Sequence, residues 1–531
     1  MTAPTMSAPA PSGGPGEMRR SLTLTGVTVN AMALIAPGAF LWVTFQLQAA
    51  QAPPSNTAAS TAAAMWPGLL FALVLALLTA YSYAELARAY PDAGTGSSYY
   101  FAEAALLEKE RPQHRKWARV AKLSVGWISH LYYWMYPGIM VAFTGVLVVY
   151  ILGLFGIALS TPLEVVAAVL FAGLTGAIAF RGISGSTMTA VVINVIQLTA
   201  LVVFSLLAVI FRVTHPDAGY VQDGITSVVL PHNITNVLFQ GTIAILLLVG
   251  FESVTALGAE AINPKRDVRR AVLLSLAIQG GIAYVLEYVS TNLFVNTSMT
   301  TSVTDASGAV TTVTGYGAAA ASGAPIGDMV RFIGDNMLGG IGLPLVLILA
   351  ATVLVALVGT TLACLNTGVR ITYVMGRDKE VPGLLGLLHG KYATPHYGVI
   401  ALAAVSAVIG GYGVLSADTL LQTILASNVG TFLVYGFTNL VVVIAFWHRA
   451  ERSFVKHIFV PILGGFANIA MLGAIVYLSI GSGGSTQTDT LIALGFDAAW
   501  IAVGAIWLAA NSRATRRSLL VSPASAKAGE A

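Results

Sequence analysis

The chain has 531 residues, of which 56% are hydrophobic and only 9% are charged. Soluble domains carry about 25% charged residues, so this composition and a mean hydropathy of +0.79 exclude a water-soluble protein. The net charge of +4 is small, and the single cysteine, Cys364, excludes an intramolecular disulfide. We therefore expect an integral membrane protein.

The first 20 residues are rich in Pro, Ala, Ser and Gly and lack the apolar core of a signal peptide, so residues 1–20 predict a disordered cytoplasmic tail. Long uncharged runs follow, each sufficient for one or two helices of roughly 20 residues across a bilayer. The runs are continuous rather than alternating, which predicts an all-α fold and not a barrel. Hydropathy and turn residues place twelve spans, at residues 22–48, 66–89, 124–153, 163–180, 187–212, 236–260, 269–295, 341–374, 396–413, 418–447, 457–480 and 489–511.

Basic residues fall on one side of this predicted topology. The loops at residues 46–65, 153–163 and 481–490 contain no Lys or Arg, whereas every Lys and Arg except Arg212 and Arg331 lies in the alternate loops or the tails. We expect the protein to lie in the cell membrane. The positive-inside rule then places both of its termini in the cytoplasm. The net positive charge is explained as a topology signal, so we expect a lipid bilayer and no nucleic acid as partner.

Two spans contain helix-breaking sequence at mid-membrane depth. In the first, Pro37 removes a helix hydrogen bond and disfavours helical geometry at Ala36, and Gly38 follows. In the sixth, Gly250 and Glu252 stand in an apolar run. Freed backbone groups and acids are costly in lipid unless they line a cavity or pathway, so both spans predict interrupted helices. The structural alternatives are a simple proline kink and a protonated Glu252 hydrogen-bonded between helices.

The interrupted spans are the first and the sixth, which are corresponding positions in two halves of five spans. Such a layout indicates an inverted-repeat transporter. The predicted repeats are residues 21–212 and residues 236–447, followed by spans 11 and 12 in residues 457–511 and a cytoplasmic tail in residues 512–531. The layout alone supports this symmetry, because the halves have no convincing residue-level identity.

Two loops carry further predictions. Residues 97–122 have the pattern of an amphipathic segment lying at the membrane interface. Residues 296–325 are rich in Ser, Thr and Gly and predict a mobile outer loop, and residues 328–336 predict a short outer helix over the bundle.

Three motifs resemble those of the amino acid–polyamine–organocation (APC) transporters. They are YAELARAYPDAGTGSSY at residues 83–99, FESVTALGAEAINPKRDVRRA at residues 251–271, and YVMGRDKEVP at residues 373–382 followed by ATP at residues 393–395. The resemblance runs in order from about residue 22 to residue 447. It implies a LeuT-type fold of 5+5 inverted repeats with two extra helices, alternating access, and a substrate site between spans 1, 3, 6, 8 and 10.

The resemblance also implies which residues contact the substrate. They come from the two interrupted spans and from the third span: Ala33, Ile35, Ala36, Pro37, Gly38, Tyr132, Tyr136, Gly250, Phe251, Glu252 and Ser253. The family usually has a Gly-x-Gly-type run in the first span to receive a substrate carboxylate. This chain has Ala-Leu-Ile-Ala-Pro at residues 33–37, which is more similar to the putrescine-importer branch and favours an amine-bearing or cationic substrate.

Buried acids support the same preference. Glu252 and Glu287 lie well inside the predicted bilayer, without Lys or Arg at comparable depth. Leaving water disfavours a charged carboxylate, so we expect these acids to take up protons for coupling or gating and to exchange a proton for a cationic ligand. The rings of Tyr132, Tyr133, Trp134 and Tyr136 on the third span can add cation–π contacts to an ammonium group, or simply pack.

Sodium coupling is the competing mechanism. In sodium-dependent relatives, hydroxyls of the eighth span and opened carbonyls of the first span hold the ion, and Thr360 and Thr361 match those hydroxyls. Ordinary packing is the alternative role of these threonines. The fifth span contains no lysine that could replace sodium.

The sequence contains no enzyme constellation. The eight histidines are scattered without metal-ligand spacing, so we expect no enzymatic activity, metal or cofactor. The predicted function is secondary transport of an amino acid or related amine, with proton coupling. A sodium-coupled or exchange-only transporter of neutral amino acids is one alternative, and a transporter-like channel or receptor without turnover is another.

Overall fold

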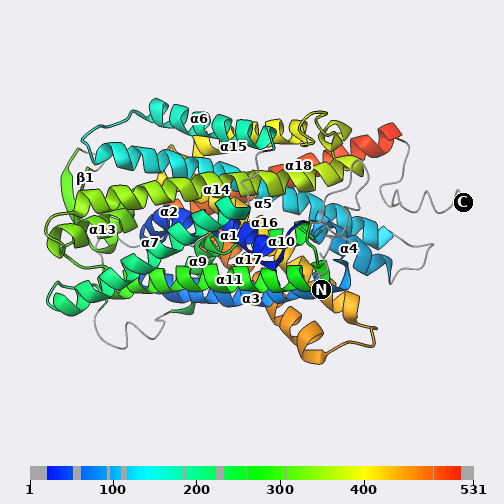
Figure 1. Ribbon diagram of the computed structural model, residues 1–531, viewed down its shortest axis with the longest axis horizontal. Helices are drawn as coiled ribbons and strands as arrows, with labels where there is room; N and C mark the ends of the chain where they lie inside the picture. The colour runs from blue at the N-terminus through cyan, green and yellow to red at the C-terminus, as the bar shows by residue number, and fades with distance from the viewer. Residues whose placement is uncertain are drawn as a thin grey trace, which may run out of the picture.

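The computed structural model describes residues 21–51, 61–91, 96–108, 116–182, 187–222, 233–258, 260–304, 308–481 and 484–515. The predicted tail at residues 1–20 and most of the predicted C-terminal tail lie outside these residues. The described chain is a bundle whose long helices run side by side along the longest axis (Figure 1). The described structure is mostly helical, and eleven helices in the described ranges are long and apolar enough to cross a membrane, as expected for a helical membrane protein.

The helices agree with the predicted spans to within a few residues, except that α5, α11 and α18 begin earlier. In chain order the helices and strands are α1 (Leu24–Ile35), α2 (Pro37–Ala49), η1 (Thr61–Ala64), α3 (Met65–Ala89), α4 (Ser98–Leu107), α5 (Lys116–Gly153), α6 (Thr161–Phe180), α7 (Thr187–Thr214), α9 (Ile234–Ala244), η4 (Ile245–Leu247), α10 (Ser253–Ala256), α11 (Pro264–Val289), η5 (Ser290–Phe294), β1 (Thr300–Thr304), β2 (Val310–Thr314), α12 (Tyr316–Ala321), α13 (Pro325–Asn336), α14 (Gly342–Arg377), η6 (Gly383–Gly386), α15 (His396–Gly413), α16 (Ala417–Phe446), η7 (Val455–Phe459), α17 (Val460–Gly481) and α18 (Gly484–Thr515). The turns η5 and η7 are π-helical, and η1, η4 and η6 are 3-10 turns.

The first span is interrupted where the sequence predicts. α1 ends at Ile35 and α2 begins at Pro37, because proline has no N–H to continue a helix but suits the first position of a new one. Between them, Ala36 adopts a φ of 23° in the left-handed region. The prediction of a break rather than a simple kink is confirmed.

The sixth span is also interrupted. α9 and the turn η4 end at Leu247, and only the four residues of α10 continue the span after an irregular stretch. Gly250 in that stretch has a φ of 126°, which L side chains rarely adopt. The two breaks touch, because a Cβ placed on Gly250 would lie 2.8 Å from the Leu34 Cβ.

One end of the bundle carries a β-hairpin that was not predicted from the sequence. β1 and β2 pair antiparallel, with Thr300 opposite Thr314 and Thr304 opposite Val310, and their β-branched residues suit strands. The short helix α13 lies beside them at the left of Figure 1, which confirms the predicted helix at residues 328–336. We call this the hairpin end.

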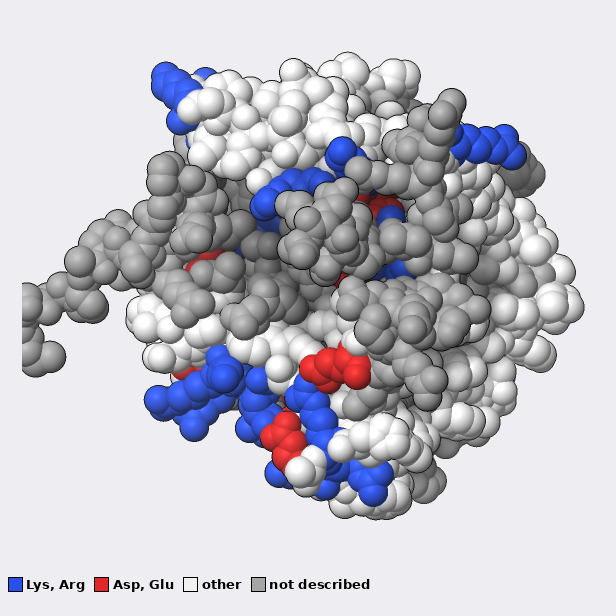
Figure 2. Space-filling model, turned by 90° about the vertical axis from the view of Figure 1, so that its right-hand side faces the viewer, with Lys and Arg blue, Asp and Glu red and all other residues white. Residues whose placement is uncertain are grey.

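The opposite end carries most of the Lys and Arg residues, and we call it the basic end. Figure 2 shows their side chains gathered in clusters on this face. Several are paired with acids of neighbouring elements: Arg269 contacts Glu85 at 2.9 Å and joins α11 to α3, and Arg370 contacts Glu260 at 2.8 Å. These ion pairs connect elements far apart in the sequence.

Helix α4 differs from the predicted interfacial segment. Both Tyr99 and Phe101 are buried, and α4 packs against α5 and α16 instead of lying alone at the surface. Lys122, which the same segment contains, is buried on α5 between Glu103 (2.6 Å) and Asp378 (2.9 Å). The described parts of the segment, residues 97–108 and 116–122, therefore belong to the bundle, because their buried aromatic and charged side chains contact other helices.

Candidate substrate site around Glu252

Glu252 lies directly after the irregular stretch of the sixth span, and its side chain is fully buried. Its Oε2 accepts hydrogen bonds from the Gly250 amide (3.0 Å) and the Tyr435 hydroxyl (2.8 Å). Its Oε1 accepts from the hydroxyls of Tyr133 (3.1 Å) and Tyr132 (3.5 Å). Among the described residues, no Lys, Arg or His pairs with this acid. The site is therefore a buried acceptor surrounded by neutral donors.

Aromatic rings surround this carboxyl group. The ring centroids of Tyr132 and Tyr133 are 4.1 Å apart, and Phe251 lies 5.2 Å from Tyr435 and 6.0 Å from Tyr83. Tyr132, Tyr133 and Tyr435 turn their hydroxyl groups toward the carboxyl group, and a carboxylate near aromatic rings is the chemistry that recognises an organic ammonium group. The arrangement suits a small cationic amine.

Two of these partners were absent from the predicted substrate residues. Tyr133 and Tyr435 both donate to Glu252; the predicted substrate residues of the third span are Tyr132 and Tyr136, and Tyr133 is predicted only among the cation–π rings. Tyr133 follows Tyr132 directly, and Tyr435 lies on the tenth span, which the family resemblance assigned to the site. The assignment of the tenth span to the site was the indication of Tyr435 that the sequence offered. It does not indicate which residue of that helix faces Glu252.

The remaining predicted residues of the third and sixth spans lie around the turn. The Tyr136 hydroxyl donates to the Leu246 carbonyl at 2.7 Å, so it binds the opened backbone of the sixth span instead of Glu252. The Ser253 hydroxyl donates to the Gly250 carbonyl at 2.6 Å and closes the turn. The structure thus brings Tyr132, Gly250, Phe251, Glu252 and Ser253 together, whereas Tyr136 contacts the backbone of the sixth span at Leu246.

The predicted residues of the first span divide into two groups. Ile35 and Ala36 are buried at the break, and Ala36 donates its amide to the Met32 carbonyl at 3.1 Å. Gly38 faces a different neighbour, because a Cβ placed on it would lie 3.0 Å from the Gln197 side-chain oxygen on α7. Pro37 begins α2 between these two groups. Gly38 is thus a packing position toward the fifth span.

The two threonines of the predicted sodium site have different roles. The Thr360 hydroxyl donates to the Ala33 carbonyl at 2.9 Å, which joins the eighth span to the last turn of α1. The Thr361 hydroxyl donates to Leu357 of its own helix at 2.7 Å. Only Thr360 therefore reaches the interrupted span.

The second predicted acid, Glu287, is not part of this site. It lies on α11 toward the hairpin end, is fully buried, and accepts a hydrogen bond from the Gln48 side chain at 3.2 Å. It shares no hydrogen-bond partner with Glu252 in the described structure. The two acids belong to separate clusters.

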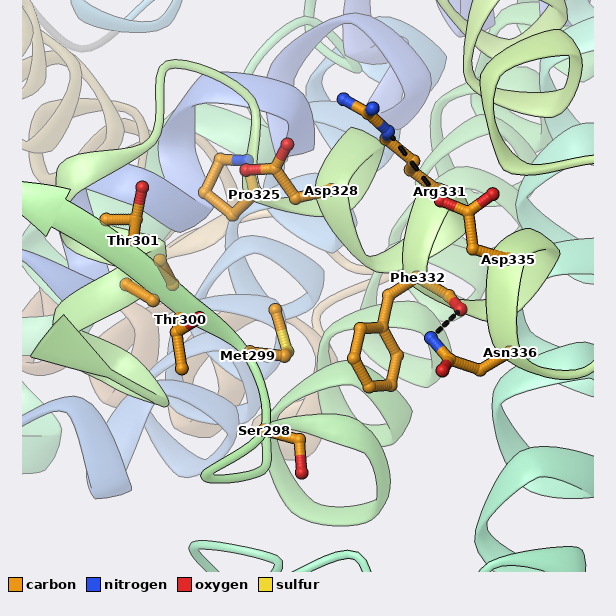
Figure 3. A pocket seen from close by; sticks show the side chains of 12 residues that line it. Ser298, Met299, Thr300, Thr301, Pro325, Asp328, Arg331, Phe332, Asp335 and Asn336 are labelled. Carbon is orange, nitrogen blue, oxygen red and sulfur yellow. Dashed lines mark hydrogen bonds and ion pairs between the residues drawn. The ribbon is translucent and has the colours of Figure 1, made fainter. Parts of the chain in front are cut away.

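A cavity of about 310 Å³ lies at the hairpin end, between residues 298–301 and α13. Figure 3 shows the Met299 and Phe332 side chains beside each other in this cavity, with Asp328 and Arg331 on α13 above them. The Arg331 side chain pairs with Asp335 at 3.7 Å. The cavity shares no residue with the Glu252 cluster and is therefore separate from the candidate substrate site.

We expect the buried carboxyl group of Asp328 in this cavity to make the stability of the folded protein depend on pH. Burial raises the pKa of the Asp328 carboxyl above its ordinary value, although hydrogen bonds from Ser322 and Tyr150 oppose the shift. A raised folded-state pKa stabilises the fold most at low pH, and this contribution is lost as the pH rises above about 4 through the folded pKa. Asp328→Asn should therefore flatten the fall in melting temperature over this range, whereas Asp335→Asn, at a half-exposed side chain, should not. Equal pH profiles for the wild type and Asp328→Asn would contradict the assignment.

Comparison with known proteins gives the family. The model of the amino acid permease family matches residues 26–520. The chain is 23% identical to the low-affinity putrescine importer PlaP of Escherichia coli (strain K12), covering 94% of this chain and 95% of the relative. It is 23% identical to the methylthioribose transporter of Bacillus subtilis (strain 168), covering 85% and 87%, and 24% identical to the branched-chain amino acid permease BcaP of the same organism, covering 78% and 81%. The chain therefore belongs to the amino acid permease family of the APC superfamily and is a multi-pass membrane transporter rather than an enzyme.

Proposed function

We propose that this protein is a secondary active transporter that carries a small amine, or an amino acid with a cationic side chain, across the cytoplasmic membrane by alternating access. The observation that carries this proposal is the fully buried Glu252 carboxyl at the contact between two interrupted helices, with hydroxyl and amide donors only. The name of one relative, a putrescine importer, supports an amine, whereas the name of another, a branched-chain amino acid permease, supports the neutral amino acid considered below.

The backbone at the two breaks favours an amine over an α-amino acid. An α-carboxylate needs unpaired amides, but the Ala36 amide is bonded to Met32 and the Gly250 amide is bonded to Glu252 itself. Pro37 has no amide hydrogen to offer. The site therefore combines a carboxyl group with neighbouring aromatic rings, which suits an ammonium group better than a zwitterion.

We also infer that the transport is coupled to protons through Glu252. A carboxyl group buried without a basic partner is most stable in its neutral form, and an arriving ammonium group stabilises the charged form. The substrate and the proton thus compete for the same carboxyl, so binding of one releases the other. The tyrosine hydroxyls of Tyr133 and Tyr435 can donate to the carboxylate in either case.

The proposed topology has twelve spans with both termini in the cytoplasm. Eleven apolar helices together with the interrupted α9 and α10 account for twelve crossings. The basic end would face the cytoplasm and the hairpin end would face outward, in agreement with the positive-inside rule. Interruptions of spans one and six support the inverted-repeat arrangement with spans 11 and 12 added.

Sodium-coupled transport of a neutral amino acid is the second candidate. It is favoured by the Thr360 hydroxyl, which lies 2.9 Å from the Ala33 carbonyl at the end of α1, so that both oxygens are available at one point. Hydroxyl and carbonyl oxygens are ligands that hard cations prefer. This candidate predicts that sodium is required for substrate binding.

A binding panel distinguishes these candidates. The purified protein is heated with putrescine, with lysine and with leucine, at two pH values, with and without sodium. A ligand at 100 times its Kd should stabilise the native state by about 2.7 kcal/mol. Stabilisation by putrescine or lysine, but not leucine, supports the acidic site, whereas stabilisation by leucine only with sodium supports the second candidate. Counterflow in proteoliposomes is the carrier test, because a channel or receptor cannot accumulate label against unlabelled internal substrate.

A further inference from the structure

A second group of buried polar side chains lies toward the hairpin end, where α2, α9 and α11 meet. Gln48 of α2 connects the three helices: its side-chain Nε2 donates to Glu287 Oε1 on α11 at 3.2 Å, and its backbone carbonyl accepts Gln240 Nε2 of α9 at 3.1 Å. All three side chains are fully buried. A carboxyl group is therefore held against a primary amide inside the bundle.

Only half of the hydrogen bonds that this pair can make are present. Glu287 Oε2 and Gln48 Oε1 are both buried and both lack a partner in the described structure. Both atoms are acceptors, so neither can satisfy the other while Glu287 is charged. Buried polar atoms without partners are rare, and each requires an explanation.

A single proton on Glu287 would give both unpaired oxygens a hydrogen-bond partner. A hydrogen on Glu287 Oε2 is a donor for Gln48 Oε1, while Gln48 Nε2 already donates to Glu287 Oε1. The carboxylic acid and the amide then form a cyclic pair with two hydrogen bonds. The orientation of the Gln48 amide is consistent with this pair, because its nitrogen faces the acid.

No nearby group provides a positive charge instead. In the described structure α11 packs on α1, α2, α3, α7, α10 and η5; α2 contains no titratable residue, and the titratable residues of α3 begin at Tyr81 toward the basic end. α1, α10 and η5 contain none, and α7 contributes only Arg212, whose guanidinium lies over the Tyr220 ring at 3.6 Å. α11 itself adds Tyr284 and Tyr288 beside the acid and its charged residues at the basic end. In the described ranges, Glu287 has no ion pair.

Unpaired polar atoms continue from Glu287 toward the hairpin end. Ser290 and Thr291 follow at spacings of three and four residues, which places them near the face of Glu287, and their buried hydroxyls lack partners in the described structure. A π-helical turn begins at Ser290, and such turns often occur at functional sites. These groups offer a polar route by which a proton can reach Glu287 from the hairpin side.

We propose that Glu287 and Gln48 form a proton-binding site, separate from the substrate site, that locks the second half of the first span against the seventh span. With the proton bound, two hydrogen bonds hold α2 to α11. Without it, only the Gln48 Nε2 hydrogen bond to Glu287 Oε1 remains and the other two oxygens are unpaired, so the contact between α2 and α11 is weakened. This inference rests on the proposed function, because weakening of this contact has a consequence only in a carrier.

The lock is tested by hydrogen–deuterium exchange of α2 in the purified protein without substrate, corrected for the intrinsic effect of pH. In the wild type, exchange of residues 37–49 should rise with pH by up to roughly tenfold per pH unit, because one proton controls the opening. Glu287→Gln mimics the protonated acid and should keep α2 protected at every pH. The swapped variant, Gln48→Glu with Glu287→Gln, rebuilds an acid–amide pair and should restore the pH response.

Each remaining outcome decides the proposal. An identical pH response in the wild type and Glu287→Gln would overturn it, and so would a swapped variant that folds but shows no pH response. If sodium rather than acid pH protects α2 from exchange, and if Glu287→Gln abolishes this protection, the proposal is overturned because the site binds an inorganic cation and not a proton. Glu252→Gln should retain the pH response of α2, so failure of the substrate-site proposal and failure of the lock are distinguishable.

Discussion

Replacement of Glu252 by glutamine is expected to weaken amine binding by roughly a hundredfold and to abolish the pH dependence of uptake. The Glu252 carboxyl is fully buried and is the negative group of the site, so a bound ammonium would lose its counter-charge. Loss of one partner from a buried charge pair costs about 2–5 kcal/mol, and about 2.7 kcal/mol corresponds to a hundredfold in Kd. Glutamine keeps the shape of the side chain; its oxygen can accept from the Gly250 amide and the Tyr435 hydroxyl, and its NH2 group can donate to the Tyr133 hydroxyl oxygen, so the fold should survive.

Uptake of labelled putrescine into proteoliposomes over a range of pH measures this effect. Tyr435→Phe removes one donor, 2.8 Å from Glu252, and should reduce affinity less, since a hydrogen bond to a charged group contributes about 1.5–3 kcal/mol. Glu164→Gln on α6, outside the site, is the matched control and should transport like the wild type. A Glu252→Gln protein with an unchanged pH profile would exclude the proton role of this acid.

Gly250→Ala is expected to destabilise the protein by about 2–6 kcal/mol. The φ of 126° at this position is strained for any residue with a Cβ, which costs about 1–3 kcal/mol. The new methyl group would also lie 2.8 Å from the Leu34 Cβ and 3.1 Å from the Leu34 carbonyl carbon, and overpacking costs about 1–3 kcal/mol more. The backbone of α1 ends beside this contact, so relief would separate the two interrupted spans.

Thermal unfolding of the purified variants measures the loss. Gly281→Ala on α11 is the matched control, because a Cβ at Gly281 meets no atom within 4 Å. In a helix, that change should be neutral or stabilise by up to about 1 kcal/mol. Equal melting temperatures for Gly250→Ala and Gly281→Ala would contradict the close contact between the two breaks.

Several features of this protein follow from the sequence without reference to tertiary structure. The apolar runs determine where helices cross a membrane, because an apolar run of about 20 residues satisfies its backbone hydrogen bonds in lipid only as a helix. Pro37 determines the first interruption because it has no amide hydrogen, and α2 begins at this residue. The glycine beside Glu252 indicated the second interruption for a similarly local reason, and the motifs indicated the family.

The partners of the buried acids were decided only by the tertiary structure. Tyr133 and Tyr435 bind Glu252 from sequence distances of 119 and 183 residues, and Gln48 binds Glu287 from a distance of 239 residues. These contacts depend on the rotation of each helix about its axis. In a membrane protein, lipid-facing and protein-facing positions are both apolar, so the sequence pattern of a span does not determine that rotation. Packing between helices determines it, and thereby selects Tyr133 beside Glu252 and turns Gly38 toward Gln197.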